Sequence, residues 1–264
     1  MASEKVFFKS SDGTRLVGIL GIPDGKPPFP TIVICHGYSS SKDSESYTTL
    51  EKLLLPTGVL TFRFDYRSHG ESQGSWEDLT LGGVKDDMKS AIDYLFTHYQ
   101  ESIDKTKFVL YGGSFSGLPA VWLTAEDERA KYLICRSGVI DPLKWYKGLY
   151  DLRKWKEQGW IETGYNRKYD IKDPRFSKLS YKLIHEIVDL NIEKVVSRVQ
   201  VPTLVMHGTA DITVLPDHSH FLYRHLGSKD KTLTFIEGVD HWYHGKRDEM
   251  QQTIVDWIKE KVLL

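Results

Sequence analysis

The sequence predicts an α/β fold, with a mostly parallel twisted sheet and helices on both of its faces. Short, largely apolar runs alternate with longer segments of helical character over most of the chain. This alternation is typical of βαβ units, in which parallel strands are joined by helices. No linker, repeat or low-complexity tract divides the 264 residues, and a chain of that length can bury one large core.

The first 140 residues contain most of the predicted sheet. Two short apolar runs separated by Ser-Asp-Gly, 5–9 and 15–21, predict an edge hairpin. Largely apolar runs predict buried strands, and the segments between them predict helices. We expect such strands at 31–35, 59–64, 108–111 and 132–135, and helices at 45–56, 83–99 and 115–127.

The alternation stops between residues 141 and 200, where no clear buried strand is visible. A structureless loop of this length would be unusual, so we predict a helical cap inserted after the sixth strand, with helices near 142–158 and 178–195. Its aromatic residues are Trp145, Tyr146, Tyr150, Trp155, Trp160, Tyr165, Tyr169 and Tyr181. Strands at 203–206 and 232–236, a helix after Pro216 and a helix at 248–261 complete the chain. The predicted organisation is a core of residues 1–140 and 201–264 that carries a cap of residues 141–200.

Residues 107–118, Lys-Phe-Val-Leu-Tyr-Gly-Gly-Ser-Phe-Ser-Gly-Leu, contain a serine at a predicted strand-to-helix turn. Such a turn needs small neighbours because the strand and the helix nearly touch, and Gly112 and Ser116 meet that need. The tight turn would hold the Ser114 hydroxyl clear of the sheet. The N–H of Phe115, at the helix start, would face a developing oxyanion. We therefore predict that Ser114 is a nucleophile.

An acid and a base follow two later strands of the predicted sheet. Asp211 lies in His-Gly-Thr-Ala-Asp after the strand at 203–206, and His241 lies in Glu-Gly-Val-Asp-His after the strand at 232–236. Carboxyl ends of parallel strands share one sheet edge, so Ser114, Asp211 and His241 should converge there. Serine needs a base to remove its proton, and that base needs a carboxylate to fix its tautomer.

These features together resemble the α/β-hydrolase superfamily, and the order Ser, Asp, His is that of the family. The segments His36-Gly-Tyr38 and Asp65-Tyr-Arg-Ser-His-Gly-Glu-Ser72 are most similar to small capped esterases of the cinnamoyl/feruloyl-esterase and serine-aminopeptidase-like groups. The resemblance implies that the N–H of Tyr38 is the second oxyanion donor. One departure is that Ser116 replaces the second glycine of Gly-x-Ser-x-Gly.

Other residues could take the same roles. Asp141 follows the strand at 132–135 and is an alternative triad acid, Ser116 is an alternative nucleophile, and Asp240 and His244 flank His241. We expect Asp211, Ser114 and His241 to be the ones that act.

Three further motifs could have a functional role or a purely structural one. Asp217-His-Ser-His220 could suggest a metal site, but no cysteine or carboxylate cluster completes a ligand set, so solvated histidines are expected there and no metal. Arg67 and His69 could contact substrate, but we expect them to brace their loop. Basic and aromatic residues are interleaved in 142–200, yet the charges alternate, so we expect a solvated face and no nucleic-acid partner.

Composition points to a soluble globular protein, since 40% of the residues are hydrophobic and the net charge is −1. The sequence has no signal peptide and no apolar run long enough to cross a membrane, which predicts a cytoplasmic protein without a membrane partner. Cys35 and Cys135 lie in apolar runs and are expected to be buried thiols. The sequence is compatible with a monomer and with a homodimer.

The predicted function is hydrolysis of a small carboxylic ester through a covalent acyl-enzyme, with no cofactor. The same machinery handles thioesters and acyl transfer, and peptide cleavage near an N-terminus is another enzymatic reading. Cap aromatics that face the cleft could form an apolar or aromatic acyl pocket. A ligand-binding receptor on the same scaffold is the non-enzymatic alternative, because fold alone does not establish function.

Overall fold

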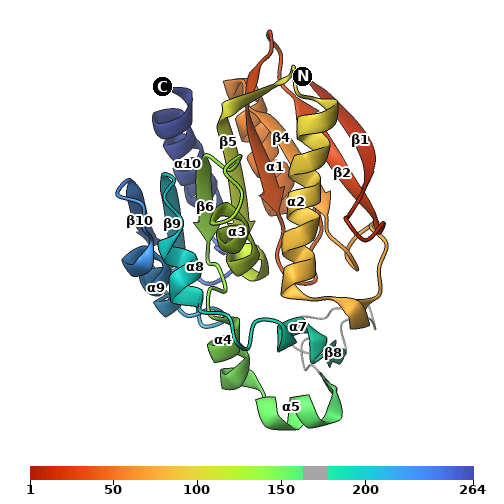
Figure 1. Cartoon of the computed structure of the whole chain (residues 1–264). Helices are drawn as coiled ribbons and strands as arrows, with labels where there is room; N and C mark the ends of the chain where they lie inside the picture. Colours follow the sequence, from red (N-terminus) through yellow and green to blue (C-terminus); the bar gives the residue numbers. More distant parts are fainter. Residues whose placement is uncertain (163–177) are drawn as a thin grey trace.

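A twisted sheet of eight strands runs through the centre of the protein (Figure 1). The computed structural model describes residues 1–162 and 178–264. The strand order is β1-β2-β4-β3-β5-β6-β9-β10; β1 pairs antiparallel with β2 and β2 antiparallel with β4, and all other neighbours are parallel. The strands are β1 (Ala2–Lys9), β2 (Arg15–Ile22), β3 (Phe29–Cys35), β4 (Leu60–Asp65), β5 (Ile103–Gly113), β6 (Tyr132–Arg136), β9 (Thr203–Gly208) and β10 (Lys231–Ile236).

The predicted fold class is confirmed, and the predicted edge hairpin is the β1–β2 pair. The prediction for β5 was too short, because the strand begins at Ile103 rather than at 108. Ile103 is buried and pairs with Phe29 of β3, but exposed and half-buried polar residues separate it from the apolar run that begins at Phe108. A pairing of that kind depends on the neighbouring strand and leaves no continuous apolar pattern in the sequence.

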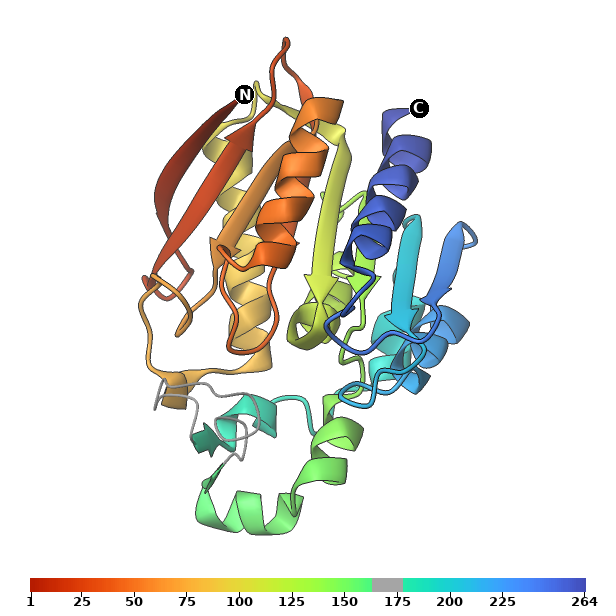
Figure 2. The ribbon, with the colours of Figure 1, turned by 180° about the vertical axis from the view of Figure 1, so that it is seen from behind.

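Helices cover both faces of the sheet. On one face lie α1 (Glu45–Leu54) and α10 (Arg247–Ile258), which Figure 2 shows in front of the strands; on the other lie α2 (Leu81–His98), α3 (Gly117–Thr124) and α9 (Asp217–His225), seen in Figure 1. Each face of the sheet has its own hydrophobic core. Successive residues of a strand contribute to the two cores in turn, since neighbouring side chains of a strand point to opposite faces. In β3, Ile32 and Ile34 belong to the core under α1 and α10, and Val33 and Cys35 belong to the core under α2 and α3. Shorter helical turns are η1 (Leu55–Thr57), η2 (Trp76–Asp78), η3 (Ser114–Ser116) and the π-helix η5 (Lys259–Leu263).

Cys35 and Cys135 are both free thiols that are buried in the sheet, as predicted. Burial raises the pKa of both thiols, that of Cys135 to about 12, so neither is a reactive thiolate at neutral pH.

The predicted cap contains short elements: α4 (Pro142–Leu149), α5 (Leu152–Gln158), a small antiparallel pair of β7 (Trp160–Glu162) with β8 (Lys178–Ser180), α7 (Lys182–His185) and α8 (Ile192–Ser197). Helices at 142–158 agree with the prediction. The second predicted helix, 178–195, is wrong in part, because its start pairs as a strand with β7. Tyr165 and Tyr169 lie outside the described residues. The elements from α4 to α7 lie beyond the carboxyl ends of the central strands (Figure 1).

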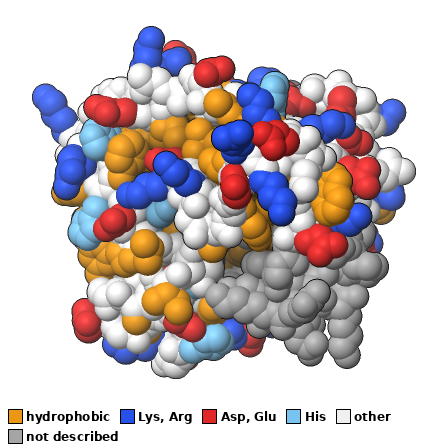
Figure 3. Space-filling view, turned by 90° about the horizontal axis from the view of Figure 1, so that it is seen from below, with side chains coloured by type: hydrophobic (Ala, Val, Ile, Leu, Met, Phe, Trp, Pro, Cys, Tyr) orange, Lys and Arg blue, Asp and Glu red, His pale blue; other side chains and the backbone are white. Residues whose placement is uncertain are grey.

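The face of the molecule beyond the strand ends carries charges of both signs. Figure 3 shows Lys and Arg side chains interspersed with Asp and Glu, and with separate hydrophobic groups between them. Within the described residues, no helix is long and apolar enough to cross a membrane.

Candidate active site

Ser114 lies at the point where β5 ends and the turn η3 begins, with φ of 56°. This left-handed conformation is uncommon for a residue with a side chain and is found where the surrounding structure enforces it. The neighbours must be small, as predicted. A Cβ on Gly112 would lie 2.6 Å from the Cβ of Ala120, and a Cβ on Gly117 would lie 2.6 Å from the Cα of Gly138.

Ser116, the alternative nucleophile, points into the protein rather than toward His241. Its Oγ accepts a hydrogen bond from the Gly113 N–H at 2.8 Å and lies 3.0 Å from the carbonyl oxygen of Cys35. The side chain is fully buried and ties the turn to the end of β3. The serine that replaces the usual glycine therefore braces the turn.

The structure brings Ser114, His241 and Asp211 together from three loops. The Ser114 Oγ lies 2.8 Å from His241 Nε2, and His241 Nδ1 lies 2.6 Å from Asp211 Oδ2. The other carboxylate oxygen of Asp211 accepts hydrogen bonds from the N–H groups of Thr213 and Val214. The loop after β9 thus fixes the carboxylate, and the carboxylate orients the imidazole.

The surroundings of Asp211 and His241 determine the protonation state of each side chain. Burial alone would raise the pKa of Asp211, but hydrogen bonds from His207 and His241 outweigh burial and hold that pKa well below its usual range. Burial lowers the pKa of His241 below its ordinary value, against the opposite effect of Asp211, and the nearby charge of Arg136 lowers it further. Asp211 is therefore ionised at neutral pH, and His241 is neutral and able to accept a proton.

Two residues at this site had no role in the sequence prediction. His207 is fully buried, and its Nε2 lies 3.1 Å from the same Asp211 oxygen that contacts His241. Arg136 is the last residue of β6, and its Nη1 donates to the carbonyl oxygen of His241 at 3.1 Å. A charged residue at the carboxyl end of a buried strand was the signal that could have identified Arg136.

The predicted oxyanion donors adjoin Ser114 on the chain and in space. A Cβ on Gly37 would lie 3.4 Å from the Ser114 Cβ, so the loop after β3 runs directly beside the serine. The rings of Tyr38 and Phe115 pack edge to face with centroids 5.5 Å apart. The residues that carry the two expected N–H donors therefore lie close to Ser114 and to each other, and their role stays a prediction.

The alternative acids and bases are engaged elsewhere. Asp141 caps the start of α4 by accepting a hydrogen bond from the Lys144 N–H at 2.9 Å. Asp240 and His244 contact each other at 2.6 Å on the exposed side of the loop. Neither arrangement places these groups on His241.

His218 corrects one expectation. It was expected to be solvated, but it is buried, and its Nδ1 accepts hydrogen bonds from the N–H groups of Ile140 and Asp141. Burial lowers the pKa of His218 to about 4. His220 is exposed, as expected. Over residues 1–162 and 178–264, no cluster of three or more His, Cys, Asp or Glu side chains could hold a metal ion.

The loop after β4 is braced as predicted. The Arg67 guanidinium lies 2.7 Å from Asp87 and 2.8 Å from Asp12, and the Nδ1 of His69 lies 3.0 Å from the Arg67 carbonyl oxygen. These contacts connect the loop to α2 and to the β1–β2 turn.

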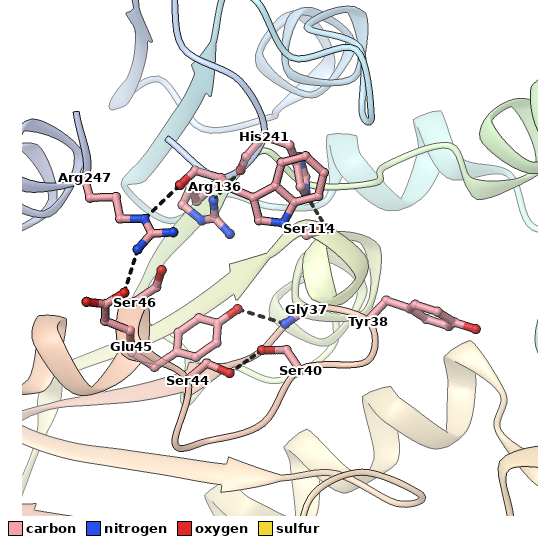
Figure 4. A pocket seen from close by; sticks show the side chains of 12 residues that line it. Gly37, Tyr38, Ser40, Ser44, Glu45, Ser46, Ser114, Arg136, His241 and Arg247 are labelled. Carbon is pink, nitrogen blue, oxygen red and sulfur yellow. Dashed lines mark hydrogen bonds and ion pairs between the residues drawn. The ribbon is translucent and has the colours of Figure 1, made fainter. Parts of the chain in front are cut away.

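A pocket of about 250 Å³ opens beside Ser114 (Figure 4). One wall consists of His241, Arg136 and Arg247, and the opposite wall is formed by the loop after β3 and the start of α1. Figure 4 shows the Tyr38 side chain pointing away from this space. The residues that line the pocket are Gly37, Tyr38, Ser40, Ser44, Glu45, Ser46, Tyr47, Ser114, Arg136, His241, Trp242 and Arg247.

Known proteins resemble the chain over most of its length. It is 36% identical to caffeoylshikimate esterase of Arabidopsis thaliana over 98% of this chain and 86% of that protein. It is 28% identical to the uncharacterized protein YfhR of Salmonella typhimurium over 90% of this chain and 74% of that protein. Among solved structures, Est1E of Butyrivibrio proteoclasticus with bound ferulic acid has a TM-score of 0.84 at 22% identity, covering 98% of this chain and 100% of Est1E.

The structural neighbour has the same α/β-hydrolase fold, in agreement with the strand order and the helices on both faces of the sheet. Residues 26–248, which include Ser114, Asp211 and His241, match the family described as serine aminopeptidase, S33. The chain therefore belongs to the serine aminopeptidase S33 family of α/β-hydrolases.

Proposed function

We propose that the protein is a serine hydrolase that cleaves carboxylic esters through a covalent acyl-enzyme. The observation that carries the proposal is the imidazole of His241, which lies 2.8 Å from the Ser114 hydroxyl and 2.6 Å from the Asp211 carboxylate. A serine hydroxyl is a weak nucleophile unless a base within hydrogen-bond distance takes its proton.

These contacts determine which group donates and which accepts each proton. An ionised Asp211 accepts a hydrogen bond from the Nδ1–H of His241, which leaves Nε2 to accept the proton of Ser114 as the hydroxyl attacks the ester carbonyl. The imidazolium then protonates the leaving alcohol. In the second half of the reaction His241 takes a proton from water as the water oxygen attacks the acyl carbonyl; the imidazolium then returns that proton to the Ser114 oxygen as the bond to the acyl group breaks and the acid is released.

The tetrahedral intermediates carry a negative oxygen that needs donors. We assign this role to the backbone N–H groups of Phe115, the residue after Ser114, and of Tyr38, in the loop that runs beside Ser114. Donors held in place before reaction stabilise that charge without reorganisation, and the loss of one such donor typically costs about 10²–10³-fold in kcat.

The ester preference is supported by the 36% identity to caffeoylshikimate esterase, whose name describes an ester substrate. The family description supports a second candidate, hydrolysis of an amide near a peptide N-terminus. Thioester hydrolysis or acyl transfer would use the same residues. The short contacts among Ser114, His241 and Asp211 argue against a receptor without activity, because such a receptor has no need for them.

We also propose that residues 141–200 act as a cap that influences substrate choice. The Trp145 Nε1–H donates to the Thr213 carbonyl oxygen at 2.7 Å, two residues from Asp211, and the Trp76 Nε1–H donates to the Lys178 carbonyl oxygen at 2.8 Å. Part of the aromatic set packs within the segment itself, since Trp155 and Tyr146 are buried. The acyl pocket would then use the remaining rings.

A substrate panel tests these readings. It contains p-nitrophenyl esters from acetate to decanoate, p-nitrophenyl ferulate, a thioester and an aminoacyl p-nitroanilide, each assayed with the wild type and with Ser114→Ala. We expect the highest kcat/KM for an oxygen ester and its loss in the variant. A higher kcat/KM for the anilide than for the esters would replace the proposed esterase activity with a peptidase activity.

A further inference from the structure

Arg136 is a buried cation at the wall of the Ser114 pocket. Its side chain lines the pocket although the residue is only 7% exposed. Its Nε lies 3.6 Å from the position of a Cβ on Gly113, the residue that directly precedes Ser114. The guanidinium therefore adjoins the nucleophile turn.

Within the described residues, the groups that contact this cation are neutral. The Nε donates to the Tyr111 hydroxyl at 3.0 Å, Nη1 donates to the His241 carbonyl oxygen at 3.1 Å, and the guanidinium lies 5.3 Å from the centre of the Tyr243 ring. These partners are all neutral. In the part of the chain that the structure describes, no Asp or Glu oxygen lies within 4.0 Å of Arg136.

A buried charge without an opposite charge is costly, because its hydration is lost and no ion pair replaces it. Arginine cannot escape this cost by losing its proton, and only two of its five N–H donors have acceptors among the described side chains and backbone. The remaining donors form a planar fork suited to a carboxylate.

The opposite wall of the pocket also favours an anion. It contains the N-terminus of α1, where Ser44, Glu45 and Ser46 line the space and the Ser44 side chain makes no capping hydrogen bond. A helix N-terminus carries a partial positive charge. Among the described lining residues of this wall, Glu45 carries the carboxylate, and it contacts Arg247, so these two charges compensate each other and neither is an ion-pair partner of Arg136 (Figure 4).

We propose that Arg136 forms an anion subsite beside Ser114 that binds a carboxylate carried by the ester substrate itself. The inference rests on the proposed function and narrows it to esters with an anionic group a few bonds from the scissile carbonyl. The carboxylate can belong to the acyl half or to the alcohol half, since both extend from Ser114.

The first experiment measures binding without turnover. Calorimetry of Ser114→Ala with monomethyl glutarate and with methyl valerate, a neutral ester of similar length, should give at least tenfold tighter binding of the anion. The same comparison with 4-butyryloxybutanoate and butyl butyrate tests the alcohol half. Adding Arg136→Met should abolish the preference. Equal affinities within both pairs would overturn the subsite, and this outcome does not depend on catalysis.

The second experiment measures kcat/KM for the same two pairs by pH-stat. The wild type should favour the anionic ester of at least one pair tenfold or more, and Arg136→Met should reduce that ratio to near one. The matched control Glu45→Gln/Arg247→Met removes both members of the compensated pair, so it should keep the ratio within about twofold. If Arg136→Met fails to fold, Arg136→Lys replaces it and should reduce the ratio, because lysine lacks the planar fork of donors; an unchanged ratio would overturn the assignment.

The outcomes separate the two proposals. Hydrolysis of neutral esters without any anion preference would refute the subsite and leave the esterase intact. Anion-selective binding by Ser114→Ala, together with no hydrolysis of any ester by the wild type, would refute the esterase and leave the subsite. A preference that disappears in Glu45→Gln/Arg247→Met but persists in Arg136→Met would show that Arg247 holds the anion, which also overturns the assignment.

Discussion

The Nδ1 of His241 lies 2.6 Å from the Oδ2 of Asp211, although 30 residues of chain separate the two positions. The same oxygen lies 3.1 Å from the Nε2 of buried His207, so two imidazoles share one carboxylate oxygen. Removing the carboxylate would therefore affect both the base and the buried histidine behind it.

Asp211→Asn should lower kcat by about 10⁴-fold, since an amide at this position favours the wrong tautomer of the base, as in other Ser-His-Asp hydrolases. Asp141→Asn is the matched control. Asparagine is as good a helix N-cap as aspartate, so this variant should keep both its stability and its activity. The check is kcat on the best ester of the panel. Reversed effects would move the acid to the loop after β6.

Ser116→Ala should retain activity within about tenfold but lose stability. The buried hydroxyl accepts from the Gly113 N–H, and leaving that donor unpaired costs about 1–3 kcal/mol. Denaturant unfolding should report this loss, whereas Ser114→Ala should unfold close to the wild type and lack activity. If Ser116→Ala were as inactive as Ser114→Ala while still folded, the turn would have been misinterpreted.

The acidic limb of kcat/KM should lie below pH 6.5, because burial lowers the pKa of His241 and the neutral imidazole is the active form. Arg136 also lowers this pKa, so Arg136→Met should shift the acidic limb to higher pH. The pH profile of kcat/KM on a neutral ester measures the shift. A limb that stayed in place would show that the Arg136 charge does not act on His241.

His218 should make the fold less stable as pH falls. Its folded pKa is about 4 against an ordinary 6.5, so between these values the unfolded state binds the proton and the folded state does not. Stability is therefore lost as pH falls through this window, by up to about 3 kcal/mol. His218→Gln should lose less stability than the wild type between pH 7 and pH 5 in denaturant unfolding. If the loss of stability between pH 7 and pH 5 were the same in both proteins, a group other than His218 would be responsible for it.

Much of this architecture is encoded locally. The apolar runs at β3, β6 and β9 specify buried strands because a parallel sheet covered on both faces needs apolar side chains. The convergence of Ser114, Asp211 and His241 was predictable because they follow β5, β9 and β10, and the carboxyl ends of these parallel strands share one edge of the sheet.

The parts that were missed depend on contacts between distant segments. The start of β5 is defined by Phe29, β8 by its partner β7, and the burial of His218 by the N–H groups of Ile140 and Asp141. The position of Arg136 against the His241 loop likewise required the folded arrangement. Sequence periodicity carries no information about such pairings.

The most direct test of the central claim is to identify the residue that becomes covalently modified. The protein would be treated with a fluorophosphonate, and the adduct would be mapped by mass spectrometry of its peptides in the wild type, Ser114→Ala and Ser116→Ala. We expect one adduct, on Ser114, which is lost in Ser114→Ala and kept in Ser116→Ala. An adduct that persists in Ser114→Ala, or a wild type that hydrolyses esters without being labelled, would contradict this expectation.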